Sequence, residues 1–158
     1  MLIVFMIYIK KGTNVMKTRI IYSNFDERTG ISEVIISNKY GEFRGCARLK
    51  EGDRPSMITG PCCAEKKAYI KYYKERIKLL NYQIKALNDC LTMIEQTKYC
   101  NINSHEARKI KRFIYHLTVE KKEWENKIYK THNNILDYIR EKAAAENEYK
   151  KRMEKKKS

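Results

Sequence analysis

The chain has 158 residues, which is the size of a single domain. Apolar residues make up 42% of it, enough for a hydrophobic core, and charged residues make up 34%, a share typical of long solvated helices. The 34 lysines and arginines against 19 aspartates and glutamates give a net charge of +15 at pH 7. This charge favours anionic partners such as nucleic acid, nucleotides or an acidic protein surface, unless the lysines only solubilise helix surfaces.

The five cysteines indicate a reducing compartment. Their number is odd and no export signal precedes them, so we expect free thiols and a location in the cytoplasm of a host cell. The cysteines and histidines lack the ligand spacing of a metal site, and we expect no metal and no cofactor. Cys90 comes one residue before an apolar helix position and is expected to behave as a small buried hydrophobe.

The first nine residues, MLIVFMIYI, are all apolar. This run is too short to cross a bilayer, which needs about 20 residues, and it lacks the basic start and the cleavage site of a signal peptide. We therefore expect no membrane partner. Two interpretations stay open: residues 1–15 form a first strand, or they lie upstream of a true start at Met16.

Residues 16–60 predict a small antiparallel sheet. Thr18–Tyr22, Glu33–Ser37 and Glu42–Leu49 have strand-like composition, and turn-rich segments separate them. Gly45, among larger residues, indicates a bulge or a close backbone approach. A sheet this short needs a helix or another subunit against it. Alternation along the third strand places four residues on one face: Phe43, Gly45, Ala47 and Leu49.

Residues 61–149 predict an antiparallel helical hairpin, with helices over 61–98 and 104–148. Pro61 suits a first helical position, and Asn103 suits an N-cap whose capping box Glu106 closes. Apolar positions of the first helix repeat in steps of three and four: Ile70, Tyr73, Ile77, Leu80, Ile84, Leu87, Leu91 and Ile94. Such a seam faces one partner helix.

The second helix has a matching seam that contains two polar residues. Its members are Ile110, Ile114, Leu117, Lys121, Trp124, Ile128, Thr131, Ile135 and Tyr138. Lys121 is interpreted as a side chain whose stem covers apolar surface, with docking of a third helix as the alternative. Residues 150–158, KKRMEKKKS, are expected to form a basic tail that frays. The predicted fold class is therefore α+β: a small N-terminal antiparallel sheet followed by a long antiparallel helical hairpin.

The chain carries no recognisable catalytic motif. It contains no P-loop, no glycine-rich dinucleotide motif, no zinc-protease motif and no nucleophile elbow. Asp53 and Ser56 are better explained as residues that cap the turn before Pro61. We expect a protein that binds and does not catalyse.

The start of the second helix is the most specific candidate site. Arg108 and Arg112 are four residues apart and so share a helix face, and a helix N-terminus attracts phosphate. Two arginines can fork onto phosphate oxygens in a way that lysine cannot. The alternative is a solvated basic face. A second candidate for an anionic ligand consists of Arg44, Arg48 and Arg54, which are more typical of exposed surface.

Two stretches carry a resemblance to a known class of proteins. YGEFRGCARLKEGDRPSMITGPCCAEKKA, followed by TKYCNINSHEARKIKRF, resembles small phage-encoded proteins that pair an N-terminal sheet with a helical hairpin. Within that class the chain is similar to the anti-Thoeris sponges, over about Tyr40 to Ile128. The resemblance implies an oligomer that sequesters, without cleavage, a cyclic ADP-ribose-type signal or a cyclic oligonucleotide, in pockets lined by arginines, aromatics and asparagine.

The resemblance suggests particular ligand-binding residues. Arg108 and Arg112 match best, Arg54 and Asn103 follow because they precede the helices, and Tyr99 is the expected stacking residue. The leading hypothesis is thus a phage-derived immune-evasion protein that sequesters a cyclic nucleotide signal. One alternative is a basic inhibitor or binder directed at nucleic acid, similar to an anti-CRISPR protein. The other is a coiled-coil structural or assembly protein.

Overall fold

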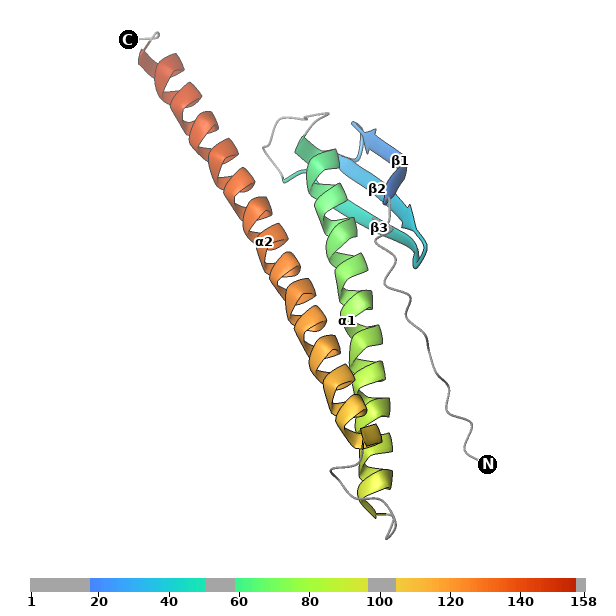
Figure 1. Cartoon of the computed structure of the whole chain (residues 1–158). Coiled ribbons are helices and arrows are strands. Elements are labelled where there is room, and N and C mark those ends of the chain that lie inside the picture. Colours follow the sequence, from blue (N-terminus) through green and yellow to red (C-terminus); the bar gives the residue numbers. More distant parts are fainter. Residues whose placement is uncertain (1–17, 51–58, 97–104, 156–158) are drawn as a thin grey trace.

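A computed structural model describes residues 18–50, 59–96 and 105–155 of the chain. Three antiparallel strands form a sheet in the order β1-β2-β3, and two long helices follow them (Figure 1). The expected α+β class, with a small sheet before a helical hairpin, is confirmed. The elements are β1 (Arg19–Asp26), β2 (Ile31–Asn38), β3 (Gly41–Arg48), α1 (Thr59–Gln96) and α2 (His105–Lys155).

The first two strands are longer than the sequence predicts, because Asp26 closes the turn between them. Its carboxylate accepts hydrogen bonds from the backbone N–H of Arg28 at 3.0 Å and from the hydroxyl of Thr29 at 2.7 Å. Gly30 completes the turn with a φ of 64°, a conformation that favours glycine. The turn is therefore shorter than the turn-rich segment expected between the first two strands, and Asn24 lies in β1.

The sheet packs on α1 through a glycine and two alanines. An added Cβ on Gly45 of β3 would lie 1.9 Å from the backbone oxygen of Ala64 and 2.5 Å from the nitrogen of Ala68. Gly45 thus marks a close backbone approach, and the irregularity in strand pairing falls instead in β1, between Ile20 and Tyr22. The predicted alternation in β3 is confirmed. Buried residues from both layers form the core: Val34, Ile36, Phe43, Ala47, Ala64, Ala68 and Tyr72.

Helix α1 is the middle layer of the molecule, with the sheet on one side and α2 on the other (Figure 1). Every position of the two predicted seams is buried or half-buried, so the seams do face each other. Seam residue Lys121 is half-buried, and its Nζ reaches Glu125 at 3.7 Å, as expected for a stem that covers apolar surface. The expectation that Cys90 is buried is wrong: it is exposed, because it lies about 100° around the helix from the seam position Leu91.

Helix α2 extends well beyond the start of α1. The hydroxyl of Tyr138 lies 2.9 Å from Oγ1 of Thr59, so the residues after Tyr138 pass the first turn of α1. The 17 residues 139–155 add about 25 Å of helix at 1.5 Å per residue. The helix continues past the expected end at 148 into the segment expected to fray, because Ala143–Ala145 favour helix and Arg152 pairs with Glu148 at 2.6 Å.

Candidate functional site

Helix α2 carries a row of basic and aromatic side chains on the surface that faces away from α1. We call it the basic stripe and define it by five exposed cations and two exposed tyrosines: Arg108, Lys111, Arg112, Tyr115, Lys122, Tyr129 and Lys130. From residue 108 to residue 130 the stripe is about 33 Å long at 1.5 Å per residue. The stripe follows one row of helix positions that repeats in steps of three and four and contains no acidic residue: 108, 112, 115, 119, 122, 126, 129 and 133.

Six cations elsewhere in the helices are paired, whereas others, such as Lys67, Lys71 and Lys85, are exposed and make no ion pair with another described residue. Arg76, Lys78, Lys121, Arg140, Lys142 and Arg152 each pair with an acidic side chain. None of the five cations in the stripe makes an ion pair with another described residue. Tyr115 and Tyr129 stand between them with 66% and 68% of their surface exposed. An exposed aromatic ring among uncompensated cations suits a ligand that has both phosphates and flat bases.

The structure places two of the five residues predicted to bind a ligand. Arg108 and Arg112 lie together in the first turns of α2, on the exposed surface, as their spacing indicates. Arg54, Tyr99 and Asn103 lie outside the described residues. Both arginines are exposed, and neither is among the residues that line the groove described below.

The second anionic candidate is weakened by an ion pair. Arg44 lies on the open face of the sheet, where its guanidinium pairs with the carboxylate of Glu33 on the neighbouring strand. Arg48 is exposed at the end of β3, and Arg54 lies outside the described residues. Because Arg44 already has an anionic partner, this face offers less free positive charge than the basic stripe.

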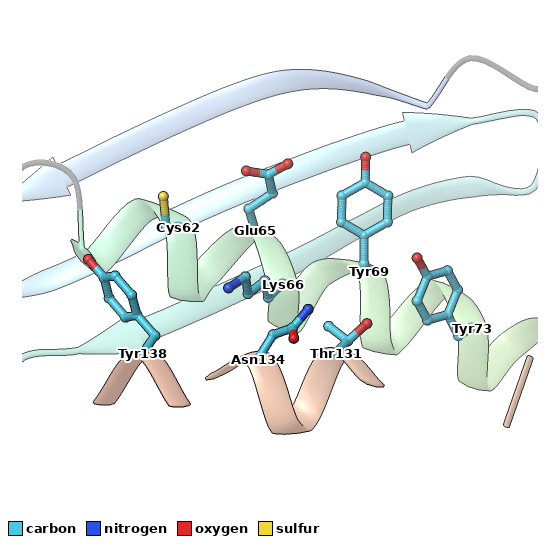
Figure 2. A pocket seen from close by; sticks show the side chains of 8 residues that line it. All are labelled: Cys62, Glu65, Lys66, Tyr69, Tyr73, Thr131, Asn134 and Tyr138. Atoms are coloured by element: carbon cyan, nitrogen blue, oxygen red, sulfur yellow. The ribbon is translucent and has the colours of Figure 1, made fainter. Parts of the chain in front are cut away.

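A shallow groove lies between the two helices at the sheet end of the hairpin (Figure 2). Its volume is about 280 Å³. Five lining residues come from α1 and three from α2: Cys62, Glu65, Lys66, Tyr69, Tyr73, Thr131, Asn134 and Tyr138. We call it the interhelical groove. Figure 2 shows Lys66 between the two helices, and its Nζ lies 5.7 Å from the centre of the Tyr138 ring.

The groove has hydrogen-bonding side chains and phenol rings but little reactive chemistry. Burial raises the pKa of Tyr73, and burial together with the nearby Glu65 raises that of Tyr69, so both phenols stay neutral near pH 7. Burial also raises the pKa of the neighbouring Cys63 thiol, in spite of Lys66, which makes this cysteine a poor nucleophile. The groove is therefore suited to holding a polar molecule rather than to attacking one.

Next to the groove, aromatic residues join the sheet to both helices. Tyr72 of α1 contacts Phe43 of β3 and Trp124 of α2, with ring centres 5.2 and 5.6 Å apart. Arg76 donates to Oε1 of Glu120 at 2.8 Å, and Trp124 donates to the same oxygen at 3.2 Å. The Arg76 side chain is only 14% exposed. This aromatic junction ties the three layers together. Glu120 accepts from both Arg76 and Trp124, but Nε of Arg76 is buried without a hydrogen-bond partner among the described residues.

Sequence reasoning missed most of these residues. Tyr115 and Tyr129 follow the same three-and-four spacing as the arginines, so a search for a second, polar row on the helix would have found them. No comparable sequence pattern predicts the groove, because Lys66 and Asn134 line it together only through the axial alignment of two helices. Local spacing carries no information about that alignment.

Comparison of the chain with protein-family models, curated proteins and solved structures found no match. Over the ranges that the structure describes, neither helix has a stretch both long and apolar enough to span a bilayer. In the same ranges, no three histidine, cysteine, aspartate or glutamate side chains gather where they would hold a metal ion.

Proposed function

We propose that this protein binds single-stranded nucleic acid along the basic stripe of α2, without cleaving it. The observation that carries the proposal is the combination of five cations without ion pairs and two exposed tyrosines on an acid-free helix face. Such a face attracts phosphates by releasing their counterions. The net charge of +15 adds a long-range attraction for any polyanion.

The two tyrosines favour a single strand over a duplex. Unpaired bases present flat faces that stack on exposed aromatic rings, at about 1–3 kcal/mol per base, whereas the bases of a duplex are already stacked on each other. Tyr115 and Tyr129 are 14 residues apart, about 21 Å along the helix, so a strand that follows the cations passes both rings. Cations and tyrosine rings along one helix face contact phosphates and the flat faces of bases rather than the base edges that distinguish one base from another. We therefore expect little preference for a particular nucleotide sequence.

Salt titration of strand binding tests the proposal. A fluorescently labelled strand of about 20 nucleotides is titrated with protein, and anisotropy gives the dissociation constant from 50 to 200 mM salt. If the strand neutralises all five cations, the slope of log K against log salt is about −3.5, a loss of about 100-fold in affinity over that range. Replacing Arg108 and Arg112 by glutamine should reduce the slope by about 1.4, because two phosphate contacts are lost.

Two matched variants serve as controls. Lys67→Gln with Lys71→Gln removes the same charge at the same spacing from an exposed face of α1, and should leave the affinity nearly unchanged. Tyr115→Ala should lower affinity by about 5- to 150-fold with the salt slope preserved, since stacking is not electrostatic. Equal losses from the two double variants would mean that only net charge matters and would contradict a defined stripe.

The interhelical groove favours a second candidate, capture of a cyclic nucleotide signal. Its tyrosines, its asparagine amide and the Lys66 ammonium are the types of group that hold a base and a phosphate, and they match the chemistry implied by the resemblance at other positions. In this alternative Arg108 and Arg112 bind the ligand only if further residues complete a pocket around them.

The same titration separates the two candidates. Cyclic nucleotides and ADP-ribose derivatives are added to the protein–strand complex at increasing concentration. If the signal binds the groove, it leaves the strand in place and its affinity falls on Lys66→Gln but not on the double glutamine variant of the stripe. If Arg108 and Arg112 hold the signal instead, it displaces the strand and the double variant abolishes its binding.

A further inference from the structure

The face of α1 that packs on the sheet continues as an apolar row beyond the sheet. Ala64, Ala68 and Tyr72 lie under the strands, and the contact between Arg76 and the Tyr40 ring, at 4.3 Å, marks the end of this layer. The same helix face then presents Leu79, Tyr82, Ala86, Cys90 and Met93. Leu79, Tyr82 and Met93 are 46%, 75% and 68% exposed. A helix face with this apolar content is typical of an interface.

The spacing of this row is symmetric about Ala86. Leu79 and Met93 lie seven residues to either side of it, and Tyr82 and Cys90 lie four residues to either side. If two copies of α1 pack antiparallel about a two-fold axis at Ala86, Leu79 of each copy meets Met93 of the other, and Tyr82 meets Cys90. The small side chain of Ala86 meets its own equivalent at the axis, where the two helices come closest. Such self-complementarity is what an isologous dimer interface requires.

The charges beside the row fit the same arrangement. Lys85 and Asp89 are exposed on one flank of it, and neither makes an ion pair with another described residue. In an antiparallel pair the same flanks of the two helices face each other. Lys85 of one copy then lies within about one turn of Asp89 of the other, and the symmetry produces this pair twice.

The sheet fits the arrangement as well. It covers α1 only as far as Arg76, and the helix ends at Gln96, so the uncovered stretch is 77–96. The middle of that stretch is Ala86. A second helix of the same length, centred on the same residue, therefore lies between the two sheets of the dimer and overlaps about 30 Å of helix at 1.5 Å per residue. Because α2 lies on the other side of α1, its basic stripe stays exposed (Figure 1).

We propose that this row is a homodimer interface in which two α1 helices pack antiparallel about Ala86. The dimer presents two basic stripes, one on each outer α2 helix. The observations that support the dimer do not involve the basic stripe, so this proposal is independent of the proposed nucleic-acid binding. Ala86→Glu places two carboxylates against each other at the axis. We expect it to raise the dimer dissociation constant by at least about 100-fold, as unpaired like charges at an interface do.

Sedimentation equilibrium of the full chain over about 1 to 100 μM measures this constant. Ile139→Glu is the matched control, because it places the same charge at another exposed apolar helix position that is outside the row. Circular dichroism checks that both variants keep their helices, and Leu79→Lys is a second variant of the row. A wild-type monomer at 100 μM would overturn the proposal, as would a dimer that persists in Ala86→Glu. A wild-type monomer would mean that the apolar row packs against something other than a second copy of this chain.

Cysteine cross-linking tests the direction of packing. In the antiparallel pair, Ala86→Cys places two thiols at the axis, and mild oxidation should link residue 86 to residue 86. The two native Cys90 side chains lie about 12 Å apart along the helices in this arrangement, too far for a disulfide. Peptide mapping of the oxidised protein identifies the linked residues. A disulfide between two Cys90 residues in the wild type would instead show parallel packing and overturn the proposal.

Discussion

The two ends of the helical hairpin are built differently. At the sheet end, three layers bury Val34, Ile36 and Tyr72 nearly completely, and tyrosine and tryptophan rings fill the junction. At the loop end, two helices pack on each other alone, and most of their side chains outside the seams are exposed. The difference indicates that the sheet end supplies most of the stability, and that the loop end is free to present binding surfaces. Three measurements of stability test this division between the two ends.

The largest loss of stability is expected from Gly45→Ala. The added methyl group would overlap the α1 backbone at Ala64, so the sheet and the helix must move apart. We expect the free energy of unfolding to fall by about 3 kcal/mol, measured by urea denaturation. Cys46→Val is the control, because residue 46 lies on the same strand but points to the open face, where a change stays within about 0.5 kcal/mol. Equal effects of the two variants would contradict the close approach.

Trp124→Ala and Phe113→Ala compare the two ends on the same helix. Trp124 contacts Tyr72 and Tyr73 and donates to Glu120, so its removal should cost about 3 kcal/mol, the lower end for a tryptophan because the ring is half-buried. Phe113 is 52% exposed near the loop end, and its removal should cost about 1 kcal/mol or less. Thermal and urea unfolding of both variants measure the difference. A larger loss from Phe113→Ala would place the stability at the other end.

The smallest effect is expected at alkaline pH. Burial raises the pKa values of Tyr72 and Tyr73 above the ordinary value of 10.0, although Arg76 lowers that of Tyr72 in part. The folded state therefore prefers the neutral phenols. This contribution is fully present below a pH of about 10 and is lost as the pH rises through the raised pKa values. Urea midpoints measured from pH 8 to pH 11 should fall less steeply for Tyr72→Phe with Tyr73→Phe than for the wild type. Equal slopes would contradict the burial of these phenols as the cause.

The sequence predicts the elements well because their signals are local. The seams and the buried row of β3 each follow from spacing within one element, and Gly45 stands out because its neighbours are large. The ends of the first two strands were less predictable. Composition predicts a longer turn between them than the structure has, because the Asp26 side chain closes the turn. Cys90 was misplaced because one residue from a seam is a rotation of about 100° around the helix.

The candidate site is less predictable for a physical reason. Arg108 and Arg112 share a face by spacing alone, and the structure places them so. The contact of Arg76 with Glu120, and the meeting of Lys66 with Tyr138, depend on how far one helix slides along the other. That alignment is fixed by packing of the whole seam and by the aromatic junction, and no short stretch of sequence encodes it.

The order of the elements has a consequence for how the chain folds. Each layer packs on the element that directly precedes or follows it in the sequence: β1 on β2, β2 on β3, the sheet on α1, and α1 on α2. No later segment has to pass between two earlier ones. The hairpins close from their turns outward, so most contacts form at small loop-closure entropy, which is the topology of fast-folding proteins. A chain emerging from the ribosome can complete the sheet and cover it with α1 before α2 has been synthesised.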